Sequence, residues 1–110
     1  MKLKDKVCIV TGGAMGNGLG IVKVFLKYGA KVIVLDYADE LKDTLLKLRE
    51  EFPNSTVSGY KVDIRDNKTV KACIDDVHNK YGDIDILVNN AGVCKLETFE
   101  NMDDELRDFH

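Results

Sequence analysis

The most informative stretch of this sequence is Thr11-Gly12-Gly13-Ala14-Met15-Gly16-Asn17-Gly18-Leu19-Gly20. It joins an apolar, β-branched run over 6–10 to a helical periodicity over 19–28, so it predicts a strand, a turn and a helix in succession. Glycines suit such a turn because they accept positive φ and let the backbone approach a ligand closely. The helix that starts here points unpaired N–H groups and the positive end of its dipole at its ligand, which favours a pyrophosphate. Taken alone, the stretch is also compatible with a purely structural tight turn.

The rest of the chain alternates short apolar runs with longer helical periodicities. Asp66 is the expected N-cap of the third helix, and Gly29 and Gly82 are expected to end the first and third helices. The pattern predicts strands over 6–10, 31–35, 56–62 and 84–88, helices over 19–28, 38–52 and 66–81, and the first turns of another helix over 101–110.

This order of elements predicts an α/β fold with a doubly wound parallel sheet, right-handed crossovers and helices on both faces. The strand order in such a sheet is 3-2-1-4, and ligands bind beyond the carboxyl ends of the first and fourth strands. Glycine-bearing segments, 11–20 and 89–92, follow those two strands. We therefore expect both segments to lie at one ligand site.

Composition narrows the class of protein. The 110 residues fit one domain over 1–110, and a net charge of −3 without a basic stripe argues against nucleic-acid binding. No apolar stretch is long enough for a membrane span or a signal peptide, so we expect no membrane association and a cytoplasmic location. Cys8, Cys73 and Cys94 show no CxxC spacing, which suits a reducing compartment and gives no metal signature.

Three nucleotide chemistries compete for the glycine stretch. A phosphate-binding P-loop needs Lys followed by Ser or Thr after its last glycine, and here Leu19 follows Gly18, so that option fails. Methyltransferases that use S-adenosylmethionine share the GxGxG pattern of 16–20, but they usually carry an acidic residue just before the glycines, which this chain lacks. A dinucleotide is the third option.

The spacing Thr-Gly-x-x-x-Gly-x-Gly over 11–18 resembles the cofactor loop of the short-chain dehydrogenase/reductase family. Asn89-Asn90-Ala91-Gly92 looks like the second signature of that family, at the usual separation. The resemblance covers essentially the whole chain. It implies the N-terminal, incomplete portion of a Rossmann-type domain that binds a nicotinamide dinucleotide.

The resemblance also assigns residues to the cofactor. Asp36, at the end of the second strand, would bind the adenosine ribose hydroxyls and repel a 2′-phosphate, so NAD(H) is the expected cofactor. Asp63 and the backbone of Ile64 would contact the adenine, whereas Thr11 and Asn89 would tie the fourth strand to the glycine loop. Position 17 departs from the family, which usually has a branched apolar residue there. The expected cofactor-binding residues are Gly12, Ala14, Met15, Gly16, Asn17, Gly18, Asp36, Asp63, Ile64, Asn90, Ala91 and Gly92.

The residues that perform proton transfer in the resembling family are not in this chain. That family uses a Ser and a Tyr-x-x-x-Lys, and no tyrosine here has a lysine four positions later. His78 and His110 have no partner spacing that suggests catalysis or metal binding. The resemblance thus implies the cofactor-binding half of an oxidoreductase that moves hydride between NAD(H) and a small-molecule carbonyl/alcohol pair.

Two alternatives remain at this point, a methyltransferase and a non-catalytic dinucleotide-binding module. The apolar fourth strand, 84–88, is expected to present an open sheet edge, which favours pairing with another chain and hence a homo-oligomer.

Overall fold

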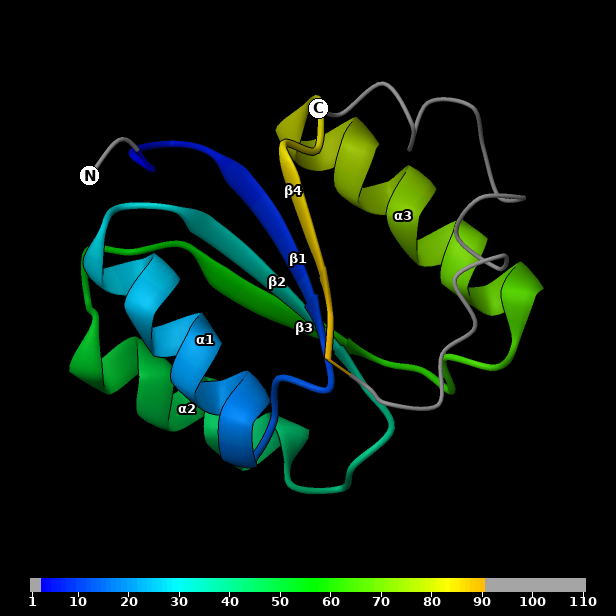
Figure 1. Ribbon diagram of the computed structural model, residues 1–110, viewed down its shortest axis with the longest axis horizontal. Coiled ribbons are helices and arrows are strands. Elements are labelled where there is room, and N and C mark those ends of the chain that lie inside the picture. The colour runs from blue at the N-terminus through cyan, green and yellow to red at the C-terminus, as the bar shows by residue number, and fades with distance from the viewer. Residues whose placement is uncertain (1–2, 91–110) are drawn as a thin grey trace.

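The computed structural model describes residues 3–90, which form a four-stranded sheet with the order β3-β2-β1-β4 and every strand pair parallel. Helices cover both faces, with α1 and α2 on one side and α3 on the other (Figure 1). The expected fold class and strand order are confirmed. The elements are β1 Val7–Thr11, α1 Gly16–Lys27, β2 Lys31–Asp36, α2 Leu41–Glu51, β3 Val57–Lys61, α3 Asn67–Tyr81 and β4 Ile86–Asn89.

The two central strands are apolar over 7–10 in β1 and 32–35 in β2, because both of their faces are covered there. In β1, Val7 and Ile9 belong to the core that α3 closes, whereas Cys8 and Val10 belong to the core beneath α1 and α2. Burial of a parallel sheet on both faces requires such continuous apolar runs. Burial raises the pKa of the Cys8 thiol to about 11, so this cysteine serves as a core residue.

The helix ends follow local chemistry. Asp66 accepts a hydrogen bond from the N–H of Thr69 at 3.3 Å and caps α3, as expected. Gly29 and Gly82 have φ of 91° and 87° and follow the last residues of their helices, also as expected. The prediction for the start of α1 was wrong by three residues, because the helix begins at Gly16 inside the glycine stretch instead of at residue 19.

Two other element starts differ from the sequence prediction for identifiable reasons. The start of α2 lies at Leu41 instead of 38, and the N–H of Ala38 is bound to the carboxylate of Asp36 at 2.9 Å. The start of β4 lies at Ile86 instead of 84, because the preceding Asp85 uses its side chain and its N–H to bind the backbone of Val7. The expected helix over 101–110 lies outside the described residues.

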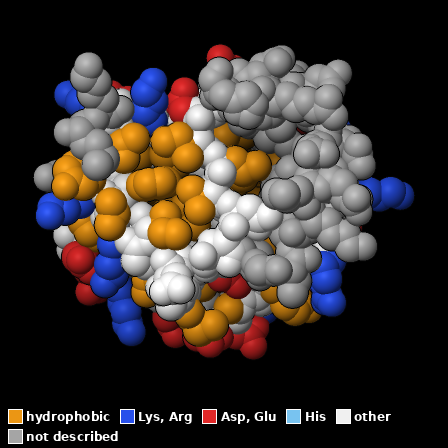
Figure 2. All heavy atoms as spheres, viewed as in Figure 1, with side chains coloured by type: hydrophobic (Ala, Val, Ile, Leu, Met, Phe, Trp, Pro, Cys, Tyr) orange, Lys and Arg blue, Asp and Glu red, His pale blue; other side chains and the backbone are white. Residues whose placement is uncertain are grey.

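Hydrophobic side chains gather on the face of the molecule where α1 lies (Figure 2). On that helix Val24 and Tyr28 are 47% and 37% exposed. Within the described part of the chain, β4 pairs only with β1, and all its residues are partly accessible. Residues 3–90 contain no helix with the length and apolar character that crossing a bilayer demands.

The carboxylate of Asp85 gives a test of how β1 and β4 are joined. Its Oδ2 accepts the N–H of Val7 at 2.9 Å, so Asp85→Ala leaves that donor without its charged acceptor. We expect the variant to lose about 1.5–3 kcal/mol of unfolding free energy, measured by urea titration. Asp85→Asn retains an oxygen acceptor and should lose less.

The matched control for this experiment is Asp83→Ala, because the Asp83 side chain is 91% exposed and its one ion pair among residues 3–90 is with His78 at 3.8 Å. It should change stability by less than about 0.5 kcal/mol. Equal losses of unfolding free energy in Asp83→Ala and Asp85→Ala would contradict the role of the Asp85 carboxylate in joining β1 to β4.

Candidate functional site

The carboxyl ends of β1 and β4 meet in register and are joined by side chains. Thr11 pairs with Asn89 across the sheet, and its fully buried hydroxyl donates to Asn89 Oδ1 at 3.2 Å. The same hydroxyl accepts the N–H of Asn90 at 2.9 Å. The expected tie between Thr11 and Asn89 is therefore confirmed, and it brings the two glycine-bearing segments together.

The start of α1 lies directly against this junction. The carbonyl of Gly12 accepts a hydrogen bond from Nδ2 of Asn90 at 3.4 Å. A methyl carbon on residue 18 would lie 2.0 Å from the same carbonyl oxygen and 2.6 Å from Asn90 Nδ2. Only glycine allows this approach, so Gly18 sets how closely the helix sits on the strand ends.

The first turn of α1 presents backbone donors. The helix's first intrahelical bond joins the N–H of Leu19 to the carbonyl of Met15 at 3.2 Å, and an α-helix gives the preceding N–H groups of Gly16, Asn17 and Gly18 no internal acceptor. The Met15 side chain makes no capping hydrogen bond and is 51% exposed. Together with the helix dipole, these donors make an anion site that suits a pyrophosphate.

Asp36 is held at the end of β2 by backbone donors on both sides. Its Oδ2 accepts the N–H of Ala14 and its Oδ1 accepts the N–H of Ala38, each at 2.9 Å. The carbonyl of Ala14 in turn accepts the hydroxyl of Thr44 in α2 at 2.9 Å. The side chain of Ala14 is buried, so this residue shapes the turn through contacts within the protein. Each Asp36 oxygen keeps a lone-pair direction that these two bonds leave unused.

Thr44 supports the glycine turn through its bond to the Ala14 carbonyl, and the sequence analysis missed it. It lies on the apolar stripe of α2, three positions after Leu41 and one before Leu45. A hydroxyl on the apolar stripe of the helix was the available signal, because a partly buried polar group also needs a partner.

A hollow of about 240 Å³ opens beside Asp36, at the carboxyl ends of β2 and β3. Leu35, Val62 and Ile64 give it an apolar floor, and each of these side chains is buried. Two carboxylates stand at its rim. The residues that line it are Gly12, Leu35, Asp36, Tyr37, Val62, Asp63, Ile64 and Arg65.

Asp63 and Arg65 form a forked ion pair at this rim. The guanidinium donates Nε to Asp63 Oδ1 at 3.0 Å and Nη2 to Oδ2 at 2.9 Å, and the N–H of Arg65 adds a bond of 2.9 Å to Oδ1. These hydrogen bonds from Arg65 lower the pKa of the Asp63 carboxyl to about 2. The sequence analysis placed Asp63 here but missed Arg65, whose signal was a charge of opposite sign two residues after a strand-ending acid.

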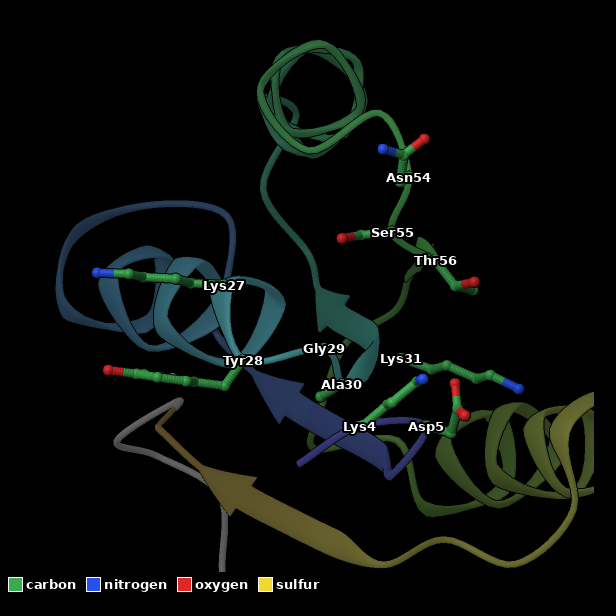
Figure 3. Close-up of a pocket in the computed structure, with 10 residues that line it drawn as sticks. All are labelled: Lys4, Asp5, Lys27, Tyr28, Gly29, Ala30, Lys31, Asn54, Ser55 and Thr56. Atoms are coloured by element: carbon green, nitrogen blue, oxygen red, sulfur yellow. The ribbon is translucent and has the colours of Figure 1, made fainter. Parts of the chain in front are cut away.

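A larger hollow, of about 460 Å³, lies at the opposite, amino-terminal edge of the sheet (Figure 3). It adjoins the carboxyl ends of α1 and α2, where the helix dipoles disfavour anions. Lys27 and Lys31 border it but point in opposite directions (Figure 3). It therefore offers no convergent set of donors comparable to the turn at 12–18.

The structure brings most of the expected cofactor residues to one edge of the sheet. The turn over 12–18, Asp36, the segment 63–64 and Asn90 all follow the carboxyl ends of the strands. Ala91 and Gly92, also expected at the cofactor, and Cys94 lie outside the described residues.

Comparison with known proteins gives consistent matches. The family model for short chain dehydrogenase matches residues 6–108. The oxidoreductase UcpA of Salmonella typhimurium is 42% identical over 99% of this chain and 41% of its own length. A 3alpha-hydroxysteroid dehydrogenase of Mediterraneibacter gnavus is 41% identical over 96% of this chain and 42% of its own length.

A solved structure shows the same similarity in three dimensions. The L-sorbose reductase of Gluconobacter frateurii, solved with NADPH and L-sorbose, superimposes with a TM-score of 0.78 and 34% identity, over 99% of this chain and 41% of that one. The chain thus spans about two fifths of the length of these relatives. Matched along nearly all of its residues by both the family model and these relatives, the chain belongs to the short-chain dehydrogenase family.

Proposed function

We propose that this chain binds NAD(H), as the cofactor-binding portion of an oxidoreductase that acts on a small-molecule carbonyl/alcohol pair. The observation that carries the proposal is the Asp36 carboxylate, which two backbone N–H groups fix between the glycine turn and the apolar hollow. A carboxylate in that position suits the two hydroxyls of an adenosine ribose.

The residues around the hollow fit the rest of the dinucleotide. The hollow, about 240 Å³ with an apolar floor, suits an adenine ring, with the Asp63 carboxylate and the backbone of Ile64 at its polar edge. The amides that open α1 would hold the pyrophosphate, with the exposed side chains of Met15 and Asn17 flanking it. Asn90 would lie beside the nicotinamide ribose together with Ala91 and Gly92.

The choice of NAD(H) over NADP(H) rests on charge. A 2′-phosphate would meet the Asp36 carboxylate, and like charges brought together in a binding site cost several kcal/mol. Ala14, Met15 and Tyr37 occupy the places where NADP-binding members of the family typically carry Arg or Lys. The NADPH in the L-sorbose reductase structure belongs to that protein, and the Asp36 carboxylate is our reason to expect the other cofactor here.

The chemistry is divided between cofactor and protein. Bound NAD(H) supplies or accepts a hydride, while the protein supplies binding, orientation and electrostatics. The turn at 12–18 fixes the phosphates, and Asp36 fixes the adenosine ribose, so the other end of the cofactor extends toward Asn90. Proton transfer to the substrate is expected from residues outside this chain.

The family match favours this function over a methyltransferase, because the matched family is a dehydrogenase family. A non-catalytic dinucleotide-binding module would share every contact proposed above and differ only in turnover. We place the protein in the cytoplasm, in keeping with the free, buried thiols of Cys8 and Cys73.

Asp36 provides the direct test of cofactor choice. We expect NADH to bind about 100-fold or more tightly than NADPH, as measured by calorimetry, because of the repulsion at the 2′-position. Asp36→Ala should weaken NADH binding and narrow the ratio to less than about tenfold. Asp36→Asn removes the charge but keeps an oxygen that can accept the N–H of Ala14 or Ala38. It therefore distinguishes the effect of the charge on cofactor preference from the effect of the turn geometry.

The matched control is Asp83→Ala, which removes one carboxylate from an exposed position outside the hollow. The ratio of its affinities for NADH and NADPH should equal that of the unmodified chain. Equal affinities for the two cofactors in the unmodified chain would overturn the role of Asp36.

A pair of glycines in α1 tests the turn itself. Gly18→Ala places a carbon 2.0 Å from the carbonyl of Gly12, so we expect a lower melting temperature and loss of NADH binding. Gly20→Ala meets nothing within 4 Å and should stabilise the helix by up to about 1 kcal/mol without changing NADH affinity. The variants are compared by thermal melting and by NADH titration below both melting points. Retention of full NADH affinity in Gly18→Ala would contradict the proposed binding of the pyrophosphate by the turn at 12–18.

We also propose that this chain self-associates. β4 has an open edge within the described residues, and exposed apolar side chains lie on the α1 face (Figure 2). An unpaired, apolar edge strand favours pairing with another chain. Light scattering at high protein concentration should therefore show species larger than 12.3 kDa, and a strictly monomeric chain would contradict the proposal.

A further inference from the structure

The ion pair of Asp63 and Arg65 sits where a purine would have to be recognised. Both residues line the hollow beside Asp36, whose floor is apolar and unable to distinguish one base from another. Polar discrimination at this hollow must therefore come from its rim. Among the residues that line it, Asp63 is the carboxylate that follows β3, whereas Asp36 is bound to the glycine turn.

The hydrogen bonds of Asp63 leave one acceptor direction open in the described structure. Oδ1 accepts two donors, the N–H and Nε of Arg65, at 2.9 and 3.0 Å. Oδ2 accepts only Nη2, at 2.9 Å. An ionised carboxylate offers about four lone-pair sites, two on each oxygen. One site on Oδ2 thus stays available for a donor from a ligand.

The fork also fixes where that open site is. A bidentate guanidinium–carboxylate pair holds both groups in one plane, which a single hydrogen bond does not do. The Arg65 side chain is 73% exposed, so the pair is expected to add little to stability as a surface ion pair. Its geometric effect on the carboxylate is the larger consequence.

We propose that Arg65 is a positioning residue that holds the Asp63 carboxylate so that its free Oδ2 lone pair accepts the exocyclic amine of a purine, which makes the hollow selective for adenine over hypoxanthine. This inference rests on the proposed NAD(H) function. Hypoxanthine carries a carbonyl oxygen in place of the amine, and that oxygen would face the carboxylate lone pair without a proton between them. A site built to bind a donor rejects an analogue that lacks it.

Ionisation of the carboxylate supports the inference. The same hydrogen bonds from Arg65 that orient Asp63 keep the pKa of its carboxyl depressed to about 2, so Asp63 is an acceptor without a proton throughout the neutral range. The selectivity for adenine should accordingly be constant from about pH 5 to about pH 8, because this whole range lies roughly three or more pH units above the depressed pKa.

The experiment compares NADH with its hypoxanthine analogue, reduced nicotinamide hypoxanthine dinucleotide, by calorimetry. The unmodified protein should prefer NADH by roughly 10- to 100-fold, the effect of one hydrogen bond to a charged group. Arg65→Met keeps an unbranched apolar stem and the backbone N–H bond to Oδ1 but removes the fork, so the preference should fall to less than about threefold. Arg65→Lys keeps the charge without the fork and should also lose most of the preference.

The control is Lys61→Met, which removes an exposed cation at the end of β3, two residues before Asp63. Lys61 pairs with Asp39 and does not line the hollow, so its loss changes the local charge without touching Asp63. Lys61→Met should weaken the binding of both dinucleotides equally and leave the ratio of their affinities unchanged.

The outcomes separate this inference from the proposed function. If the unmodified protein binds neither dinucleotide, the proposed NAD(H) function fails. If it binds NADH but shows no preference over the hypoxanthine analogue, or if Arg65→Met retains the full preference, the role of Arg65 is wrong while the NAD(H) function stands. A preference lost in Lys61→Met as well would show that general charge, not the fork, governs the selectivity.

Discussion

The close approach of two backbone segments governs the functional edge of this molecule. Residue 18 lies so near the carbonyl of Gly12 that a single added carbon would stand 2.0 Å from its oxygen. Because of that contact, α1 begins directly over the end of β1. Thr11 and Asn90 then connect the same point to the end of β4. These contacts fix the N–H donors of the helix relative to the ends of the two strands. The positions of the proposed cofactor contacts depend on this arrangement.

The sheet separates stability from chemistry along the strands. The bodies of β1 and β2 are apolar on both faces and carry the core, so they cannot hold unpaired polar groups. Polar side chains appear where the strands end, at Thr11, Asp36 and Asn89. The polar groups that a ligand needs are therefore confined to the edge where backbone pairing stops, which is also where the strand order reverses.

Much of this arrangement was predictable from sequence, because periodicity and turn chemistry act locally. The apolar runs gave the strands, and Asp66 and Gly82 gave the ends of α3. The start of α1 was not predictable in the same way. Glycine disfavours helix, yet Gly18 is helical because its packing against the Gly12 carbonyl outweighs its local preference. Thr44 was missed because it acts through Ala14, a partner 30 residues away that only the folded chain brings near. Arg65 was missed although its partner Asp63 is only two residues away, because sequence alone does not show that the two side chains form a fork.

The role of Asp36 shows why the strand end is suited to a ligand before any ligand arrives. Its carboxylate already holds the N–H groups of Ala14 and Ala38, so the turn and the strand end keep their relative positions without a bound ribose. A group fixed in this way loses little further freedom on binding, and that saving appears as affinity. The same two bonds also tie the ribose position to the glycine turn that would hold the phosphates. Asp36 links the glycine turn to the end of β2 within the protein, and in the proposed function it would also accept hydrogen bonds from the cofactor.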